Sequence, residues 1–125
     1  VEGQSYTYPK ELSLNQWALN GMWKVLGDRV IAANSKASLK YHFQAKQVYL
    51  VMAPSDPQTQ QTVRVLFDGK PIAEFSGKDV KDSKVTVNKS TLYELVNFKE
   101  LTSGIIEIQV ESDGLEAFAF TFGSQ

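Results

Sequence analysis

Apolar and polar residues alternate along much of the chain, and the alternation predicts strands. The pattern is clearest in two late runs, whose large apolar residues are Ile106, Ile108 and Val110 and then Phe118, Phe120 and Phe122. A repeat of two residues is typical of a strand with one buried face. Between the runs stands Ser112-Asp113-Gly114, a sequence typical of turns. We therefore predict a β-hairpin over residues 104–123.

The length of this turn decides which side chains share a face of the hairpin. A two-residue Asp-Gly loop would place the phenylalanines opposite Glu107 and Gln109, whereas a three-residue loop with a left-handed Gly114 pairs Ile108 with Phe118. The longer loop gathers the large apolar side chains on one face, where burial stabilises by about 1.5–3 kcal/mol each. It predicts that the three phenylalanines lie in the core and form no ligand-binding surface. A second sheet must cover them, because a lone hairpin cannot bury that face.

Similar runs predict short strands along the rest of the chain, at residues 12–19, 22–25, 30–33, 63–68, 71–72, 85–87 and 91–98. Residues 37–53 read as two further strands with a turn near 45–47, and Asn20-Gly21 reads as another turn. The best helical alternative, residues 91–101, has β-branched and aromatic residues and weak capping, so a strand is favoured. About seven to ten short strands at spacings of roughly 8–12 residues predict an all-β fold, an antiparallel β-sandwich of jelly-roll type.

The length and charge of the chain bound its organisation and its partners. The 125 residues suit one domain. We expect residues 1–11 to be a linker or edge segment from a preceding domain and residues 12–125 to be the β-sandwich. Because 13 basic residues nearly balance 14 acidic ones, the charge favours neither nucleic acid nor an anionic membrane as a partner. No run approaches the ~18–20 apolar residues of a membrane helix, and the first residues lack the apolar region of a signal peptide, so an exported protein would require a longer precursor.

Few residues suggest chemistry. The chain has no cysteine, which excludes disulfides and thiolate metal sites within it. Its single histidine, His42, belongs to the polar set of a predicted strand and is interpreted as a solvated residue. The aspartates match no calcium-binding loop and are interpreted as turn residues, although calcium binding stays open. No Gly-x-Ser-x-Gly motif is present. We therefore expect no metal, no cofactor and no enzymatic activity.

Six residues are candidates for binding a ligand, and these are Asn15, Trp17, Asn20, Trp23, Tyr41 and Arg64. Recognition of a sugar needs a flat aromatic face against the apolar side of the ring and polar groups for its hydroxyls. The alternative is that both tryptophans fill the core, as large aromatic residues usually do. Alternation places Tyr41 on the inward-facing set of its strand, so a core position is also the simpler interpretation there. The sequence leaves these alternatives open.

Six fragments of the sequence form a recognisable ordered set. They are Leu14-Asn15-x-Trp17-Ala18-Leu19-x-Gly21-x-Trp23, Phe43-x-Ala45-Lys46-x-Val48-x-Leu50-Val51, Val65-Leu66-x-Asp68-Gly69, Gly77-x-Asp79-Val80, Leu92-Tyr93-x-Leu95-Val96 and Ala119-Phe120-Thr121-Phe122-Gly123. Taken together and in this order, they resemble the C-terminal domain that follows the thioredoxin-like domain in DipZ-type cytochrome c biogenesis and thiol-disulfide interchange proteins. The resemblance covers residues 12–123.

The resemblance implies a jelly roll similar to carbohydrate-binding modules, located in the periplasm or otherwise outside the cytoplasm of a bacterium. It also implies an N-terminal thioredoxin-like domain in the same polypeptide, which would carry the redox chemistry of an oxidoreductase. With no Cys-x-x-Cys, the family's catalytic residues have no counterpart here. The expected function is a non-catalytic accessory domain that binds polysaccharide, or alternatively a protein-interaction module that docks on the thioredoxin-like domain or its client. Docking predicts an apolar patch near Tyr6, Tyr8 and Trp17, whereas sugar binding predicts an aromatic groove.

Overall fold

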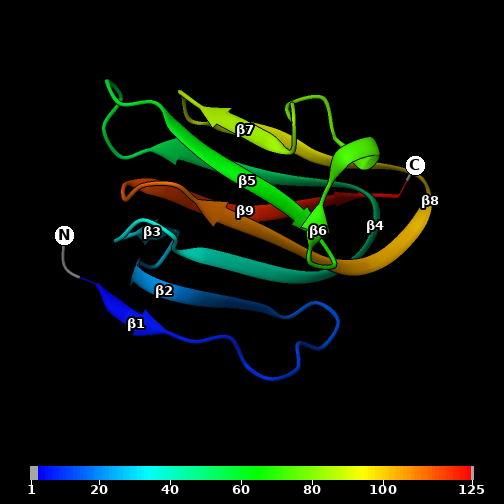
Figure 1. The fold of residues 1–125 in the computed structure, drawn as a ribbon, viewed down its shortest axis with the longest axis horizontal. Helices are drawn as coiled ribbons and strands as arrows, with labels where there is room; N and C mark the ends of the chain where they lie inside the picture. The colour runs from blue at the N-terminus through cyan, green and yellow to red at the C-terminus, as the bar shows by residue number, and fades with distance from the viewer. Residues whose placement is uncertain (1–2, 125) are drawn as a thin grey trace.

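The protein is an antiparallel β-sandwich in a computed structural model that describes residues 3–124 (Figure 1). Its strands are β1 (Gln4–Tyr6), β2 (Trp17–Val25), β3 (Val30–Ala32), β4 (Ser38–Pro54), β5 (Gln61–Phe67), β6 (Lys70–Pro71), β7 (Lys84–Val87), β8 (Thr91–Val110) and β9 (Leu115–Gly123). One short 3₁₀-helix, η1 (Ala73–Phe75), is the sole helical element among the described residues. The all-β class and the sandwich predicted from the alternation are confirmed.

Two long strands, β4 and β8, run through both layers of the sandwich. In the first sheet β1, β2, β4, β8 and β5 lie side by side, and both β6 and β7 pair with β5. In the second sheet the order is β3, β9, β4 and β8. Residues 38–45 of β4 belong to the first sheet and residues 47–54 belong to the second. Between Ala45 and Gln47 the register of β4 against β8 is irregular. Both strands curve round at the right of Figure 1.

Two predicted turns are bends within continuous strands. The prediction of two strands in residues 37–53 is wrong, because β4 continues through 45–47 with a bulge. The turn predicted at Asn20-Gly21 is also wrong, because β2 continues through it while exchanging β4 for β3 as its partner. Gly21 has a φ of 91°, and a Cβ there would lie 3.1 Å from the Cα of Ala37. A glycine that permits a bend gives the same local signal as one that forms a turn.

The predicted hairpin over residues 104–123 does not form. The second half of β8 pairs with β4 and β5 in the first sheet, whereas β9 pairs with β3 and β4 in the second. Ile108 therefore lies opposite Leu39 and Val65, and Phe120 lies opposite Leu50. Gly114 does have a left-handed φ of 98°, but its turn connects two sheets. The prediction from the turn length was wrong because it assumed that two strands adjacent in sequence pair with each other.

The phenylalanines of β9 are consequently not fully buried in the core, although Phe120 packs against it. Ile106, Ile108 and Val110 are buried as predicted, but Phe118 and Phe120 are half-buried and Phe122 is 37% exposed. The buried positions of β9 are occupied by Leu115 and Ala117. After Ala117 the register between β9 and β4 shifts. The largest wholly buried side chains come from both sheets and include Trp23, Phe43, Leu50, Met52, Leu95, Ile106, Ile108 and Leu115. Tyr93 is buried, and its hydroxyl donates to the Lys89 carbonyl at 2.7 Å, as a buried tyrosine requires.

The segment before β2 is held against the first sheet by strand pairing and side-chain contacts. Its strand β1 pairs with β2, and the Tyr8 hydroxyl lies 2.6 Å from Oγ of Ser38 and 3.0 Å from Oε2 of Glu107. The Lys40 ammonium lies 4.4 Å from the centre of the Tyr8 ring. Further along, His42 Nδ1 is 2.8 Å from the Leu12 carbonyl oxygen. The described part of the segment is therefore an arm on the outer face of the sheet.

Substituting Tyr8 with phenylalanine tests this attachment. Burial raises the pKa of the Tyr8 hydroxyl above its ordinary value, so this group contributes stability below pH ~10 that is lost as the pH rises and the unfolded chain ionises first. We expect Tyr8→Phe to lower the free energy of unfolding by about 1 kcal/mol at neutral pH. The deficit relative to wild type should shrink above pH ~10. Urea titrations at about pH 7 and about pH 10.5 measure it, and a deficit independent of pH would contradict the assignment.

Candidate functional site

An open groove lies between the two sheets, on the side formed by β2, β4 and β9. It has a volume of ≈ 280 Å³. Its buried floor comprises Leu39, Leu50 and Ala117, its aromatic walls comprise Trp17, Tyr41, Phe118 and Phe120, and residues 25–30 close one end. We call this site the aromatic groove.

Strand pairing brings the aromatic walls together. Trp17 of β2 lies directly opposite Tyr41 of β4, and residues opposite each other in an antiparallel pair share a face. The Tyr41 ring centre lies 4.9 Å from that of Phe120 and 5.0 Å from that of Phe122, both in β9. Trp17 is 53% exposed, so much of its ring surface is open to solvent. Aromatic surface of this kind is available for contact with a ligand.

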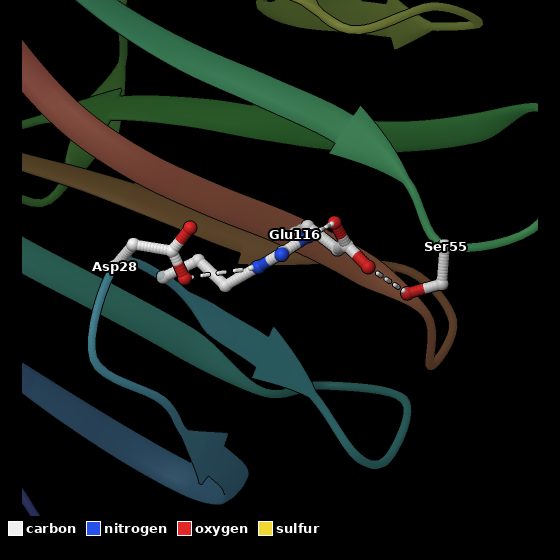
Figure 2. Close-up of polar contacts among 4 residues, drawn as sticks. Asp28, Ser55 and Glu116 are labelled. Carbon is white, nitrogen blue, oxygen red and sulfur yellow. Dashed lines mark hydrogen bonds and ion pairs between the residues drawn. The ribbon is translucent and has the colours of Figure 1, made fainter.

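Arg29 forms the polar end of the aromatic groove. Its Nη1 donates to Oε1 of Glu116 at 2.8 Å and its Nε donates to Oδ1 of Asp28 at 3.2 Å, while its guanidinium carbon lies 5.0 Å from the centre of the Phe118 ring. The Ser55 hydroxyl donates to the other oxygen of Glu116 at 2.9 Å (Figure 2). The hydrogen bonds to Glu116 and Asp28 raise the pKa of Arg29. The guanidinium is thus charged and held in a fixed position.

The candidates from the sequence separate in the structure. Trp17 and Tyr41 come together in the aromatic groove, and Tyr41 is on the inward-facing set as predicted, but at an open edge where it is only half-buried. Trp23 is a core residue, whose indole N–H donates to the Asn20 carbonyl at 3.0 Å. Arg64 lies in a different hollow on β5. The interpretation of Trp23 as core is confirmed, and the grouping of Arg64 with Tyr41 is wrong.

The two predicted asparagines do not line the aromatic groove. Asn15 is exposed with a φ of 69°, and its backbone N–H donates to the His42 carbonyl at 2.7 Å. Asn20 lies within β2, opposite Ser38 of β4. Their structural roles are to shape the approach to β2 and to hold Trp23.

Of the residues that line the groove, only Trp17 and Tyr41 were among the candidates, and the charged and aromatic residues that were missed are Asp28, Arg29, Phe118 and Phe120. The alternating phenylalanines were visible in the sequence, but the predicted hairpin assigned them to the core. Asp28 and Arg29 follow Gly27 in a turn and have no distinguishing local pattern. Only the fold brings Arg29 next to Glu116.

Two kinds of feature are absent from the described residues. Residues 3–124 contain no group of three or more histidine, aspartate or glutamate side chains placed to hold a metal ion. No helix in the same range is long and apolar enough to cross a membrane.

Comparison with known proteins identifies the family. A family model described as the thioredoxin-like C-terminal domain matches residues 1–123. The chain belongs to this family. The chain itself has no cysteine with which to carry out thiol chemistry. The resemblance inferred from the sequence fragments is confirmed.

Two curated relatives of this thioredoxin-like C-terminal domain carry the name Protein DipZ. They come from Mycobacterium bovis and Mycobacterium tuberculosis, and each is 29% identical over 119 residues, which is 94% of this chain. The chain spans 15% of the length of these relatives. DipZ is thus a much longer protein than the domain.

A solved structure shares the fold. A family two carbohydrate esterase from Cellvibrio japonicus matches with a TM-score of 0.63 and 14% sequence identity, over 85% of this chain and 30% of the esterase chain. At this identity the match is evidence for the fold. Together with the strand order, it confirms the predicted jelly-roll sandwich.

Proposed function

We propose that this domain is the binding module of a thioredoxin-like thiol-disulfide oxidoreductase and that its aromatic groove binds a saccharide. The observation that carries the proposal is the exposed ring of Trp17 beside Tyr41, in a groove that ends at Asp28 and Arg29. The module would hold its redox partner domain near polysaccharide. We place it outside the cytoplasm, where such polymers occur.

The groove suits a small saccharide in shape and chemistry. The apolar side of a sugar ring stacks on flat aromatic surface, which Trp17 and Tyr41 supply. The carboxylate of Asp28 can accept hydrogen bonds from hydroxyls, and the guanidinium of Arg29 can donate them. A volume of ≈ 280 Å³ is near the lower end of the usual range for ligand pockets, about 300–1,000 Å³. It therefore favours a short segment of one or a few sugar rings.

The shared fold with a carbohydrate esterase agrees with this proposal. The support is by analogy, because one fold serves many functions and function resides in particular sites. The residues of the aromatic groove therefore carry the argument.

A second candidate function is docking of the thioredoxin-like domain. Apolar side chains at the groove are unusually exposed, with Val25 at 48%, Leu26 at 39% and Phe122 at 37%. In addition, Gln4 pairs with Trp23 in an antiparallel register, so β1 begins beside the end of β2 that leads into residues 25–29. A preceding domain would then be tethered beside the aromatic groove. Of the three residues expected in a docking patch, only Trp17 is available, because Tyr6 packs against the core and the Tyr8 hydroxyl is hydrogen-bonded to the first sheet.

Substitutions at Gly27 test the saccharide proposal. Gly27 lines the groove, its φ lies outside the left-handed region, and no atom lies within 4 Å of where a Cβ would be. Gly27→Leu should therefore place a bulky apolar side chain at the groove without adding a stacking ring or colliding with the fold, whereas Gly27→Ala should change little. We expect Gly27→Leu to weaken binding of neutral trisaccharides (cellotriose, xylotriose or maltotriose) at least tenfold, and Gly27→Ala by less than about twofold.

NMR titration with these trisaccharides at millimolar concentration measures the effect. Equal binding by Gly27→Leu and wild type would place any saccharide site elsewhere. If wild type binds none of them but binds the free thioredoxin-like domain saturably, the saccharide proposal fails and docking is supported.

A further inference from the structure

The charges at the polar end of the aromatic groove restrict which saccharides it accepts, an inference that rests on the proposed function. Among the residues that line the groove, Asp28 and Arg29 alone are charged. Glu116 lies outside the lining but forms an ion pair with Arg29. One guanidinium therefore faces two carboxylates, which leaves a net charge of −1 at this end.

Arg29 is poorly placed to receive an acidic ligand. An arginine that recognises a carboxylate or phosphate usually presents two N–H groups side by side. In this structure Nη1 is bound to Glu116 at 2.8 Å and Nε to Asp28 at 3.2 Å, and the guanidinium lies over Phe118. The Glu116 side chain is 13% exposed and accepts a second hydrogen bond from Ser55, so it is not readily displaced. A ligand carboxylate would have to compete with these protein carboxylates.

Asp28, by contrast, is open to a ligand that donates hydrogen bonds. Its side chain is 68% exposed, and the hydrogen bond from Arg29 reaches only its Oδ1. A carboxylate accepts hydrogen bonds at both oxygens. A hydroxyl or an ammonium group on a sugar can therefore bind here, while a sugar carboxylate next to Asp28 would be repelled.

We propose that the aromatic groove binds saccharides that are neutral or carry an amino group and discriminates against acidic ones. Trp17 and Tyr41 supply the stacking surface for any of these sugars, because every pyranose has an apolar side. Asp28 supplies the discrimination, since it is the exposed member of the ion-pair network. Glu116 and Ser55 fix Arg29, and the charge of its guanidinium is already paired with the carboxylates of Glu116 and Asp28.

The test compares β-1,4-linked trisaccharides of glucose, glucosamine and glucuronic acid, which share a backbone and differ in charge. Wild type should bind the glucose and glucosamine trisaccharides at least fivefold more tightly than the glucuronic acid trisaccharide at low salt. Raising the salt concentration should reduce this ratio, because exposed charges are screened. Asp28→Asn keeps the shape of the side chain and should bring the ratio close to one. The matched control is Glu111→Gln, which removes a carboxylate from the hollow near Arg64 and should leave the ratio unchanged.

The outcomes separate this inference from the proposed function. If wild type binds none of the three trisaccharides, both the saccharide function and the charge preference are overturned. If wild type binds neutral and acidic trisaccharides equally, or if the preference persists in Asp28→Asn, the charge inference is overturned while saccharide binding stands.

Discussion

Replacing Trp23 with alanine is expected to lower the free energy of unfolding by about 3–5 kcal/mol, whereas Trp17→Ala should lower it by about 1 kcal/mol or less. Trp23 is 0% exposed, and its loss would leave a large cavity between the sheets. Trp17 is 53% exposed and leaves no such cavity. Denaturant titration followed by circular dichroism measures both. Similar losses for the two variants would contradict the assignment of one tryptophan to the core and the other to the surface.

Trp17→Ala should instead reduce binding of the neutral trisaccharides at least tenfold, because the exposed stacking face is removed. Trp17→Phe is the matched control, since it keeps a smaller aromatic face in the same position, and it should retain part of the affinity. Binding by Trp17→Ala at the wild-type level would exclude the aromatic groove as the saccharide site.

Gly104→Ala is expected to destabilise the fold by about 1–3 kcal/mol and to lower Tm by roughly 4–12 °C. Gly104 lies opposite Phe43, where β8 and β4 pair, and a Cβ at this position would collide with the ring of Phe67. That ring packs between Phe43 and Phe98, with centres 5.9 Å and 5.1 Å away. The Phe67 ring must shift to admit the added methyl group, and the shift disturbs its packing against these two phenylalanines. Differential scanning calorimetry gives the change in Tm.

A double substitution identifies the cause of the loss. Gly104→Ala combined with Phe67→Leu should be less destabilised than the sum of the two single variants, because the smaller side chain makes room for the added methyl group. Strict additivity would show that Phe67 is not the obstacle. Gly27→Ala serves as the control for a glycine substitution, since a Cβ there meets no atom within 4 Å.

The positions of the strands could be predicted from the sequence, but their pairing could not. Alternation is a local property, so Ile106, Ile108 and Val110 were correctly assigned to a buried face. Pairing depends on contacts between distant segments. A turn such as Ser112-Asp113-Gly114 serves equally well within one sheet or between two. Each of the long strands β4 and β8 looked like two elements, because a bulge and a turn interrupt the alternation in the same way.

The candidate site was predictable only in part, for a similar reason. Trp17 and Trp23 stand in the same strand, and the bend at Gly21 between them changes which partner strand each one faces. Local sequence therefore could not tell the exposed tryptophan from the buried one. The position of Arg29 depends on Glu116, which is 87 residues later in the chain. No pattern near Arg29 indicates such a partner.

The place of β9 in the second sheet has a consequence for the order in which the protein folds. This last strand in sequence is inserted between β3 and β4, and it supplies the wholly buried Leu115. A nascent chain that ends before β9 therefore has an open seam in the middle of a sheet and cannot close its core. Contacts between segments so distant in sequence also form slowly. We therefore expect a chain truncated before β9 to be unable to form the native sandwich, so that folding is completed only after the last strand has been synthesised.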